Sequence, residues 1–319
     1  MVTIKKEIGQ PDPLAPAIWT PWIEAAKTDN SIVVVSADSA GRNITQELRE
    51  TLFKDRFIAS GIQEANAALI SGGLADQGLK VIWPDMGWLF ERAYNAVTQT
   101  ITTEHYHVMM VGSGGGALAG GAGPSHNNLR DLAVMLPVPN LIVLAPADAV
   151  EAGKMSEFAL KYNGPIYLRT MAMSPTIFEN DYQFNLGDAP TVRDGADVTI
   201  IGMQEWVLKG ILAANSLAAQ GIQARVLDCS SVKPIGKEAI IKAARETGAI
   251  VTAESTNIHG GMGSAVAGVV GENYPVPLKR IALHDQYLHS GGGKLVEAYY
   301  HQTVDDLVAA VKETVQRKK

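Results

Sequence analysis

Short apolar runs rich in β-branched residues alternate along this chain with longer stretches of helical pattern, and this alternation restricts the fold more than any other feature. A run such as Ile32-Val33-Val34-Val35 lacks the polar residues at every second position that mark a half-buried strand. Fully buried strands separated by helices are typical of a parallel sheet covered on both faces. In the first half of the chain the pattern predicts strands over 32–35, 80–83, 106–111, 141–144 and 166–168, and helices over 64–75, 88–101 and 149–161.

The pattern stops between residues 171 and 196 and then resumes. That stretch holds prolines, Asn180-Asp181 and Gly187-Asp188 without a clear period, as expected of a connection between domains. Beyond it the pattern predicts strands over 198–201, 224–227, 249–253 and 278–283, and helices over 206–219, 237–247, from 263 onward and over 304–318. We therefore predict an α/β protein of two domains in series, over 1–178 and 197–319, joined by a linker over 179–196.

Charge and cysteine content exclude several classes of protein. The formal net charge is −6 and the single basic cluster is Arg317-Lys318-Lys319, so we expect no nucleic-acid partner. No run reaches the roughly 18 apolar residues of a membrane span, so we expect no membrane contact. The first ten residues are polar and charged, unlike a secretory signal, and Cys229 has no second cysteine to pair with. These features predict a reducing, cytoplasmic location.

A glycine-rich stretch over 112–123 follows the predicted strand over 106–111. Gly112, Gly114 and Ala117 meet the spacing of a dinucleotide fingerprint loosely, but the stretch has too much glycine to open a helix. A surface loop is the plain interpretation. We favour the wall of a site that a ligand or another chain approaches closely, because the stretch ends in the polar segment Gly123-Pro124-Ser125-His126. On local grounds alone, His126 would be structural or exposed.

Two further features allow both a structural and a functional interpretation. Glu64 opens a predicted helix among small and apolar residues, where the helix dipole stabilises a carboxylate. Alternatively, burial raises the pKa of this carboxyl and it shares a proton with a ligand nitrogen. The segment over 257–265 could bind an anion through backbone N–H groups, although we favour tight packing of helix on sheet. No cluster of histidines, cysteines or carboxylates has convincing metal-site spacing, so we expect no metal ligands in this chain.

Ordered blocks along nearly the whole chain, from about Pro13 to its end, resemble the C-terminal half of transketolase. In the first half they are Gly61-Ile62-Gln63-Glu64, Gly123-Pro124-Ser125-His126, Asp131-Leu132-Ala133, Pro139-Asn140 and Pro146-Ala147-Asp148. In the second half they lie at 197–201, 232–235, 246–252, 260–266 and 277–281. The resemblance implies a pyrimidine-binding domain followed by a transketolase C-terminal domain, in an enzyme that uses thiamine diphosphate and Mg²⁺.

The resemblance also implies a partner chain. Enzymes of this type hold the diphosphate and Mg²⁺ with a Gly-Asp-Gly motif followed at a distance by Asn. The sequence has no such motif, since Gly187-Asp188 continues with Ala189. This chain therefore resembles one subunit of a split transketolase. An N-terminal subunit would supply the diphosphate domain and most of the metal site, and a homodimer of this chain would lie within a two-plus-two heterotetramer.

Several cofactor contacts follow from the resemblance. Glu64 matches the glutamate that bonds the aminopyrimidine ring of thiamine diphosphate, and Asp38 matches an acidic position near the cofactor after the first strand. The segment from Met86 to Arg92 matches the wall against the pyrimidine ring. That wall is usually aromatic, whereas Met86 and Leu89 stand at the aromatic places here.

Substrate contacts are implied in the same way. His126 matches a substrate-contacting histidine, which with Glu64 would be catalytic, and Arg169 matches an arginine that binds the substrate phosphate. An interdomain salt bridge is the structural alternative for Arg169. The implied reaction transfers a two-carbon ketol unit from a ketose phosphate to an aldose phosphate.

Two positions depart from the common transketolase pattern. Ala122 stands where an acidic residue contacts a substrate hydroxyl, and about Gly114 stands where a second histidine lies. Small residues at both places predict a wider and less polar site that no longer selects for that hydroxyl. We therefore expect an atypical donor, such as apulose 4-phosphate, rather than xylulose 5-phosphate.

Three alternatives stay open on the sequence. The beta subunit of a 2-oxoacid dehydrogenase has the same two domains, but the blocks around His126 and in the second half resemble transketolase more closely. A fragment of a deoxyxylulose phosphate synthase is less expected because the chain begins and ends naturally. A non-catalytic scaffold subunit would explain Ala122 and Gly114, whereas the presence of Glu64, His126 and Arg169 argues against it.

Overall fold

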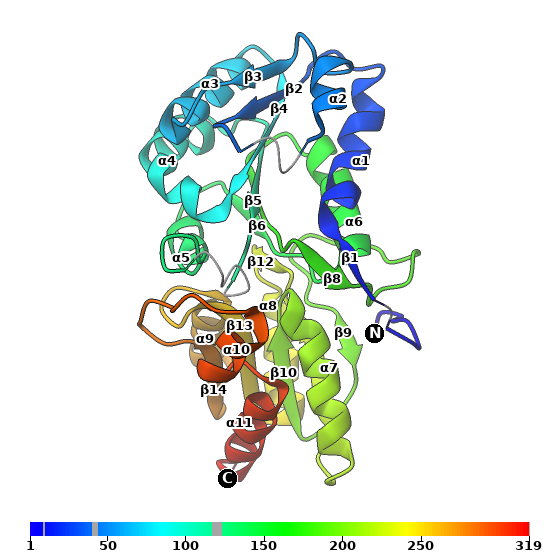
Figure 1. Ribbon diagram of the computed structural model, residues 1–319. Helices are drawn as coiled ribbons and strands as arrows, with labels where there is room; N and C mark the ends of the chain where they lie inside the picture. Colours follow the sequence, from blue (N-terminus) through cyan, green and yellow to red (C-terminus); the bar gives the residue numbers. More distant parts are fainter. Residues whose placement is uncertain (9, 40–43, 117–122, 319) are drawn as a thin grey trace.

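The computed structural model describes residues 1–8, 10–39, 44–116 and 123–318, and it shows two α/β units stacked end to end (Figure 1). The first unit contains β2 (Ile32–Ser36), α2 (Gln46–Glu50), β3 (Phe57–Ala59), α3 (Glu64–Asp76), β4 (Lys80–Met86), η2 (Gly87–Leu89), α4 (Phe90–Ala96), η3 (Val97–Thr102), β5 (Val108–Ser113), α5 (Asp131–Met135), β6 (Ile142–Leu144), α6 (Ala149–Lys161) and β7 (Ile166–Arg169). It is preceded by β1 (Pro11–Pro13) and α1 (Leu14–Ala26).

The sheet of the first unit has seven strands in the order β12-β6-β7-β5-β4-β2-β3, in which β12 (Ser231–Lys233) comes from the second half of the chain. Its six strands from the first half of the chain pair in parallel. The chain moves from β2 to β3 on one side and then returns to β4 on the other side of β2. The strand order therefore reverses between β2 and β4. In parallel sheets of this kind, ligands bind in the crevice outside the carboxyl ends of the strands at such a reversal.

Alternate residues of β2 explain why this strand is apolar on both faces. Ile32 and Val34 pack with the buried residues of α1 and α6, whereas Val33 and Val35 pack with those of α3 and α4. Successive side chains of a strand point to opposite faces, so helices on both sides of the sheet demand an unbroken apolar run. Figure 1 shows α1 and α6 on one side of the sheet and α3 and α4 on the other.

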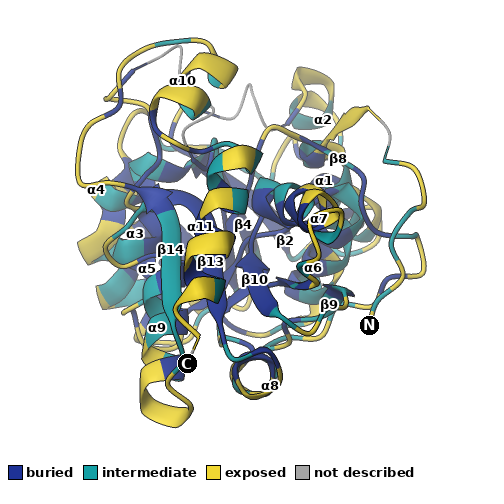
Figure 2. Ribbon diagram, turned by 90° about the horizontal axis from the view of Figure 1, so that it is seen from below, coloured by how far each residue is buried: buried dark blue, intermediate teal, exposed yellow. Residues whose placement is uncertain are grey.

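The second unit has a five-stranded sheet in the order β14-β13-β10-β11-β9, with β9 antiparallel at one edge. Its elements are β9 (Thr191–Arg193), β10 (Val198–Gly202), α7 (Glu205–Ala218), β11 (Ala224–Asp228), α8 (Lys237–Thr247), β13 (Ile250–Asn257), α9 (Met262–Asn273), β14 (Leu278–Leu283), α10 (Gly293–Tyr299) and α11 (Val304–Gln316). The central strands β10 and β13 are buried, and β14 at the edge is partly exposed (Figure 2). The predicted α/β architecture of two domains in series is confirmed.

Three short strands, β8 (Met173–Pro175), β9 and β12, pair with strands that are distant in the sequence. β12 (Ser231–Lys233) lies within the second half of the chain but pairs with β6 as the edge strand of the first sheet. Near the end of the predicted first domain, β8 pairs with β1, and within the predicted linker, β9 belongs to the second sheet. Strands of three residues are too short to show a period in the sequence, so only their distant partners reveal them.

The single helix predicted over 88–101 is another point of difference. The structure divides this segment into the 3₁₀ turn η2, the α-helix α4 and the π-helical turn η3. Among the described residues, no helix is long and apolar enough to cross a lipid bilayer.

Candidate active site at the strand reversal

Glu64 is the first residue of α3, the helix that leads from β3 to β4. It is 2% exposed, and its Oε1 lies 3.4 Å from Nη1 of Arg92 on α4. The Arg92 side chain is 62% exposed, so it screens the carboxylate only weakly. Ile62 and Leu69, on the same segment, are among the large apolar side chains that are exposed. A buried carboxylate thus lies in a segment that also carries two exposed apolar side chains.

Asp85 is a second carboxyl group near Glu64 that sequence reasoning missed. It lies on β4, one residue before the strand ends at the reversal, and it is completely buried. Its Oδ1 accepts a hydrogen bond of 2.8 Å from the Met86 N–H. Burial raises the pKa of Asp85 from 3.8 to about 6; hydrogen bonds from Ser39 and Met86 oppose this rise and the charge of Glu64 adds to it. The signal in the sequence is an acidic residue at the end of a buried strand.

The segment after β4 forms a half-buried wall beside these carboxyl groups. Met86 and Leu89 are both half-buried, and Trp88 between them packs its indole edge-on against the ring of His126, with centroids 5.0 Å apart. His126 is exposed, and its Nδ1 lies 2.8 Å from Oγ of Ser125. The prediction for this wall named Met86 and Leu89 but not Trp88, which is the aromatic residue of the segment.

Gly114 lies under this indole. It has φ +76°, a conformation that favours glycine, and a Cβ built on it would lie 3.3 Å from Cζ3 of Trp88. The space expected to open at Gly114 is therefore taken by an apolar ring. The lower polarity and greater width of the substrate site stay predictions. Ala122 lies outside the described residues.

A cavity of about 590 Å³ connects the two groups of predicted residues. Its walls include Trp88, Glu91, Arg92, Ser125, Asn127 and Arg130, and Tyr287 of the second unit. Of these residues, Arg92 contacts Glu64, and Ser125 is hydrogen-bonded to His126. Arg130 donates to Glu91 across this wall at 2.8 Å. Asp38, which follows β2 with φ +70°, is exposed at the same edge of the sheet.

Arg169 has a different surrounding from the one predicted. It ends β7, is completely buried, and donates through Nε to Asp131 at 2.9 Å and through Nη2 to the carbonyl oxygen of Asn128 at 3.1 Å. Its Nη1 bonds Gln204, which follows β10 of the second unit. All three nitrogens are engaged by protein atoms, so the guanidinium offers no free face to a substrate phosphate. The geometry favours the interdomain contact instead.

The loop considered as an anion site is filled by the protein itself. Glu254 of β13 is buried, and its carboxylate accepts hydrogen bonds from the N–H groups of Met262 and Gly263 at 2.8 and 2.7 Å. These two groups open α9 and carry the positive end of the helix dipole. The favoured interpretation, tight packing of the helix on the sheet, therefore describes this loop.

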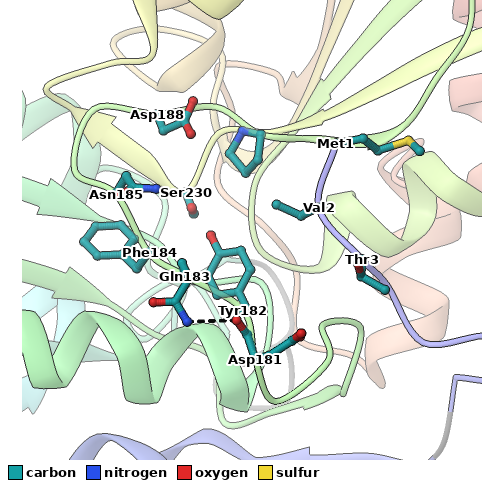
Figure 3. Close-up of a pocket in the computed structure, with 11 residues that line it drawn as sticks. Met1, Val2, Thr3, Asp181, Tyr182, Gln183, Phe184, Asn185, Asp188 and Ser230 are labelled. Atoms are coloured by element: carbon teal, nitrogen blue, oxygen red, sulfur yellow. Dashed lines mark hydrogen bonds between the residues drawn. The ribbon is translucent and has the colours of Figure 1, made fainter.

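A further cavity, of about 250 Å³, lies between the N-terminal residues and the segment after β8 (Figure 3). Tyr182 and Ser230 line it and donate to Oε1 of the buried Glu151 at 2.8 and 2.6 Å. Burial raises the pKa of Glu151 and that of Asp228 beside it. No residue of this cavity lines the one at Trp88. Across the described residues, no group of three or more acidic, histidine or cysteine side chains could hold a metal ion.

Comparisons with known proteins agree with this geometry. Residues 20–174 match the family model of the transketolase pyrimidine-binding domain, and residues 187–307 match that of the transketolase C-terminal domain. The chain is 35% identical over 298 residues to one of the subunits of the apulose-4-phosphate transketolase of Phocaeicola vulgatus, covering 92% of this chain and 95% of that one. It is 34% identical over 300 residues to the 6-deoxy-6-sulfo-D-fructose transketolase subunit SqwH of a Clostridium species, covering 93% and 92%.

A solved structure gives the same result in three dimensions. A split-gene transketolase, described as an inactive beta4 tetramer, superposes with a TM-score of 0.86 at 31% identity, covering 96% of this chain and 99% of that one. The resemblance drawn from the sequence blocks is confirmed.

Proposed function

Because this chain belongs to the transketolase family, whose members depend on thiamine diphosphate, we propose that it is the C-terminal subunit of a split transketolase with an atypical ketose donor. When bound, the cofactor supplies the nucleophilic carbon and the electron sink that transfer of a two-carbon ketol unit requires. The protein supplies position and proton exchange.

The buried carboxylate of Glu64 is the observation that carries this proposal. Its single ion pair is long and involves an exposed arginine, which leaves it available to a ligand nitrogen. A buried carboxylate oxygen placed in this way can accept a hydrogen bond from a ring nitrogen of a ligand. Met86 and Leu89 would pack on the faces of the pyrimidine ring, and Asp38 would lie toward the rest of the cofactor. These residues fit an aminopyrimidine.

The two exposed apolar side chains on the segment of Glu64 support a site shared between chains. Exposed Ile62 and Leu69 beside a buried carboxylate are expected to be covered by another protein. The sequence contains no Gly-Asp-Gly motif, so the diphosphate and Mg²⁺ would be held mainly by an N-terminal partner subunit. The similar solved tetramer of beta chains is described as inactive, as expected of an assembly that lacks the partner. We infer a heterotetramer that contains a homodimer of this chain.

His126 would contact the substrate. The hydrogen bond between Ser125 and Nδ1 orients the ring and leaves Nε2 for a hydroxyl or carbonyl oxygen of the sugar. Trp88 packs against the same ring and fixes its tilt. Arg169 would stabilise the domain interface, rather than bind the sugar phosphate.

The donor is proposed to be a ketose other than xylulose 5-phosphate. The two similar subunits are named for apulose 4-phosphate and for 6-deoxy-6-sulfo-D-fructose, and both names denote unusual sugars. Trp88 over Gly114 and the small residue Ala122 remove two polar contacts to a donor hydroxyl. Apulose 4-phosphate is our first candidate.

The test uses the chain co-purified with its partner subunit. Glu64→Gln should abolish ketol transfer and weaken thiamine diphosphate binding in calorimetry, whereas the exposed Glu157→Gln should do neither. A ketose panel then identifies the donor, and Ala122→Asp should shift preference toward xylulose 5-phosphate. Decarboxylation of 2-oxo acids without ketol transfer would replace the proposal with the dehydrogenase alternative. Full activity of Glu64→Gln would refute the assigned role.

A further inference from the structure

A smaller cavity, of about 300 Å³, adjoins the one beside Trp88. The two share Pro124, Asn127, Arg130 and Tyr287 in their walls, so they lie side by side. The first cavity lies next to the residues proposed to bind the cofactor. The second extends from it to the second unit of the chain.

The second unit builds one wall of this extension. Asn257 ends β13 and Asp285 follows β14, and both line the cavity. The N–H of Asn257 donates to the carbonyl oxygen of Leu129 at 2.9 Å, which ties this wall to the segment after His126. Nδ2 of Asn257 lies 3.4 Å from Oδ1 of Asp285. A backbone hydrogen bond to the first unit and a side-chain contact to Asp285 therefore hold Asn257 in place.

Asn127 lies where the two cavities meet. Its residue is 7% exposed, and within the described part of the chain neither Oδ1 nor Nδ2 has a hydrogen-bond partner. A buried amide without partners destabilises the folded chain, because it gives up its hydrogen bonds to water and gains none in return. Native proteins rarely keep such groups unless a ligand or water pairs with them.

The charges of the extension favour hydroxyl groups over an anion. Arg130 is paired with Glu91 at 2.8 Å, so its charge is already balanced. Asp285 adds a negative charge at the far wall and would repel a phosphate. Amide and carboxylate groups with this spacing accept and donate hydrogen bonds to neutral hydroxyls.

Building on the proposed function, we propose that this extension binds the hydroxyl-bearing part of the sugar beyond the transferred carbons, with Asn127 and Asp285 as specificity-determining residues. The second unit of the chain thereby takes part in selecting the substrate. A donor too short to reach the extension gains nothing from it.

The experiment compares donors of two lengths on the co-purified complex. Asn127→Ala and Asp285→Ala should each raise KM about tenfold for the best long donor of the ketose panel, with kcat changed less than twofold. KM for the three-carbon donor hydroxypyruvate should not change. Asn273→Ala, an exposed asparagine at the end of α9, is the matched control.

Binding without turnover separates the two proposals. Calorimetric titration with D-ribose, which carries hydroxyl groups and no phosphate, should show about tenfold weaker binding in Asn127→Ala and Asp285→Ala and wild-type binding in Asn273→Ala. If no donor gives ketol transfer but this loss of binding is seen, the proposed function fails and the sugar site stands. Wild-type KM and Kd in both variants, or equal losses with long and short donors, would overturn the site while leaving ketol transfer intact. Because Asp285 is exposed on a loop, its variant stays informative if Asn127→Ala does not fold.

Discussion

Removing the buried charge of Asp85 should stabilise this protein, and the gain should depend on pH. The folded pKa of Asp85 is raised by burial, from 3.8 to about 6, so the folded state binds a proton that the unfolded state has released. Stability is then present below pH 3.8, falls as pH rises toward 6, and stays lost above it. The difference corresponds to about 3 kcal/mol at 1.36 kcal/mol for each pKa unit. Asp85→Asn keeps an acceptor for the Met86 N–H but carries no charge.

The assay is urea unfolding of the variant and the wild type across pH. Asp85→Asn should raise the free energy of unfolding by up to about 3 kcal/mol at pH 8 and by about half of that at pH 5. The exposed Asp55→Asn serves as the matched control and should stay within about 0.5 kcal/mol at both pH values. If the variant and the wild type have the same free energy of unfolding at pH 8, or if their difference does not change with pH, burial does not raise the pKa of this carboxyl.

Three further predictions test the domain interface and the glycine-rich strand end. Arg169→Met leaves Asp131 buried without a cation and should lower the free energy of unfolding in urea by about 3–5 kcal/mol. Adding Asp131→Leu should restore most of this loss. The exposed Arg245→Met is the control and should lower the free energy of unfolding by less than about 1 kcal/mol. Asp228→Asn should flatten the fall of Tm with rising pH, because the raised pKa of Asp228 makes its ionised form unfavourable above the ordinary value of 3.8; a pH profile parallel to that of the wild type would contradict this. Gly112→Ala places a Cβ 2.7 Å from Cε2 of buried Tyr167 and should destabilise the chain by about 1–3 kcal/mol in thermal unfolding, whereas Gly73→Ala, on a helix with no atom within 4 Å, should be neutral or stabilising.

Much of the candidate site could be predicted because each residue occupies a position fixed by local sequence. Glu64 opens a helix, Met86 and Leu89 follow a buried strand, and Ser125 and His126 follow a glycine-rich segment. The resemblance to a family then assigned their roles. Asp85 was overlooked because its importance depends on burial and on the nearness of Glu64, and neither property is visible from neighbours in the sequence.

The prediction for Arg169 shows the limit of such assignments. A basic residue at the end of a parallel strand is well placed for a phosphate in an isolated domain. Here the carboxyl end of β7 faces the second unit, and Gln204 together with Asp131 surrounds the guanidinium. Only the packing of the two units against each other removes Arg169 from the surface.

Periodicity and blocks of neighbouring residues were enough to predict the α/β class, the approximate strands and helices and the family. Packing in three dimensions shows in addition that β12 completes the first sheet, that Trp88 lies over Gly114, and that Asn127 lies beside a wall built by the second unit. Each of these contacts joins segments far apart in the chain. Their free energy arises from burial and complementary shape at a distance, which no local pattern of residues records.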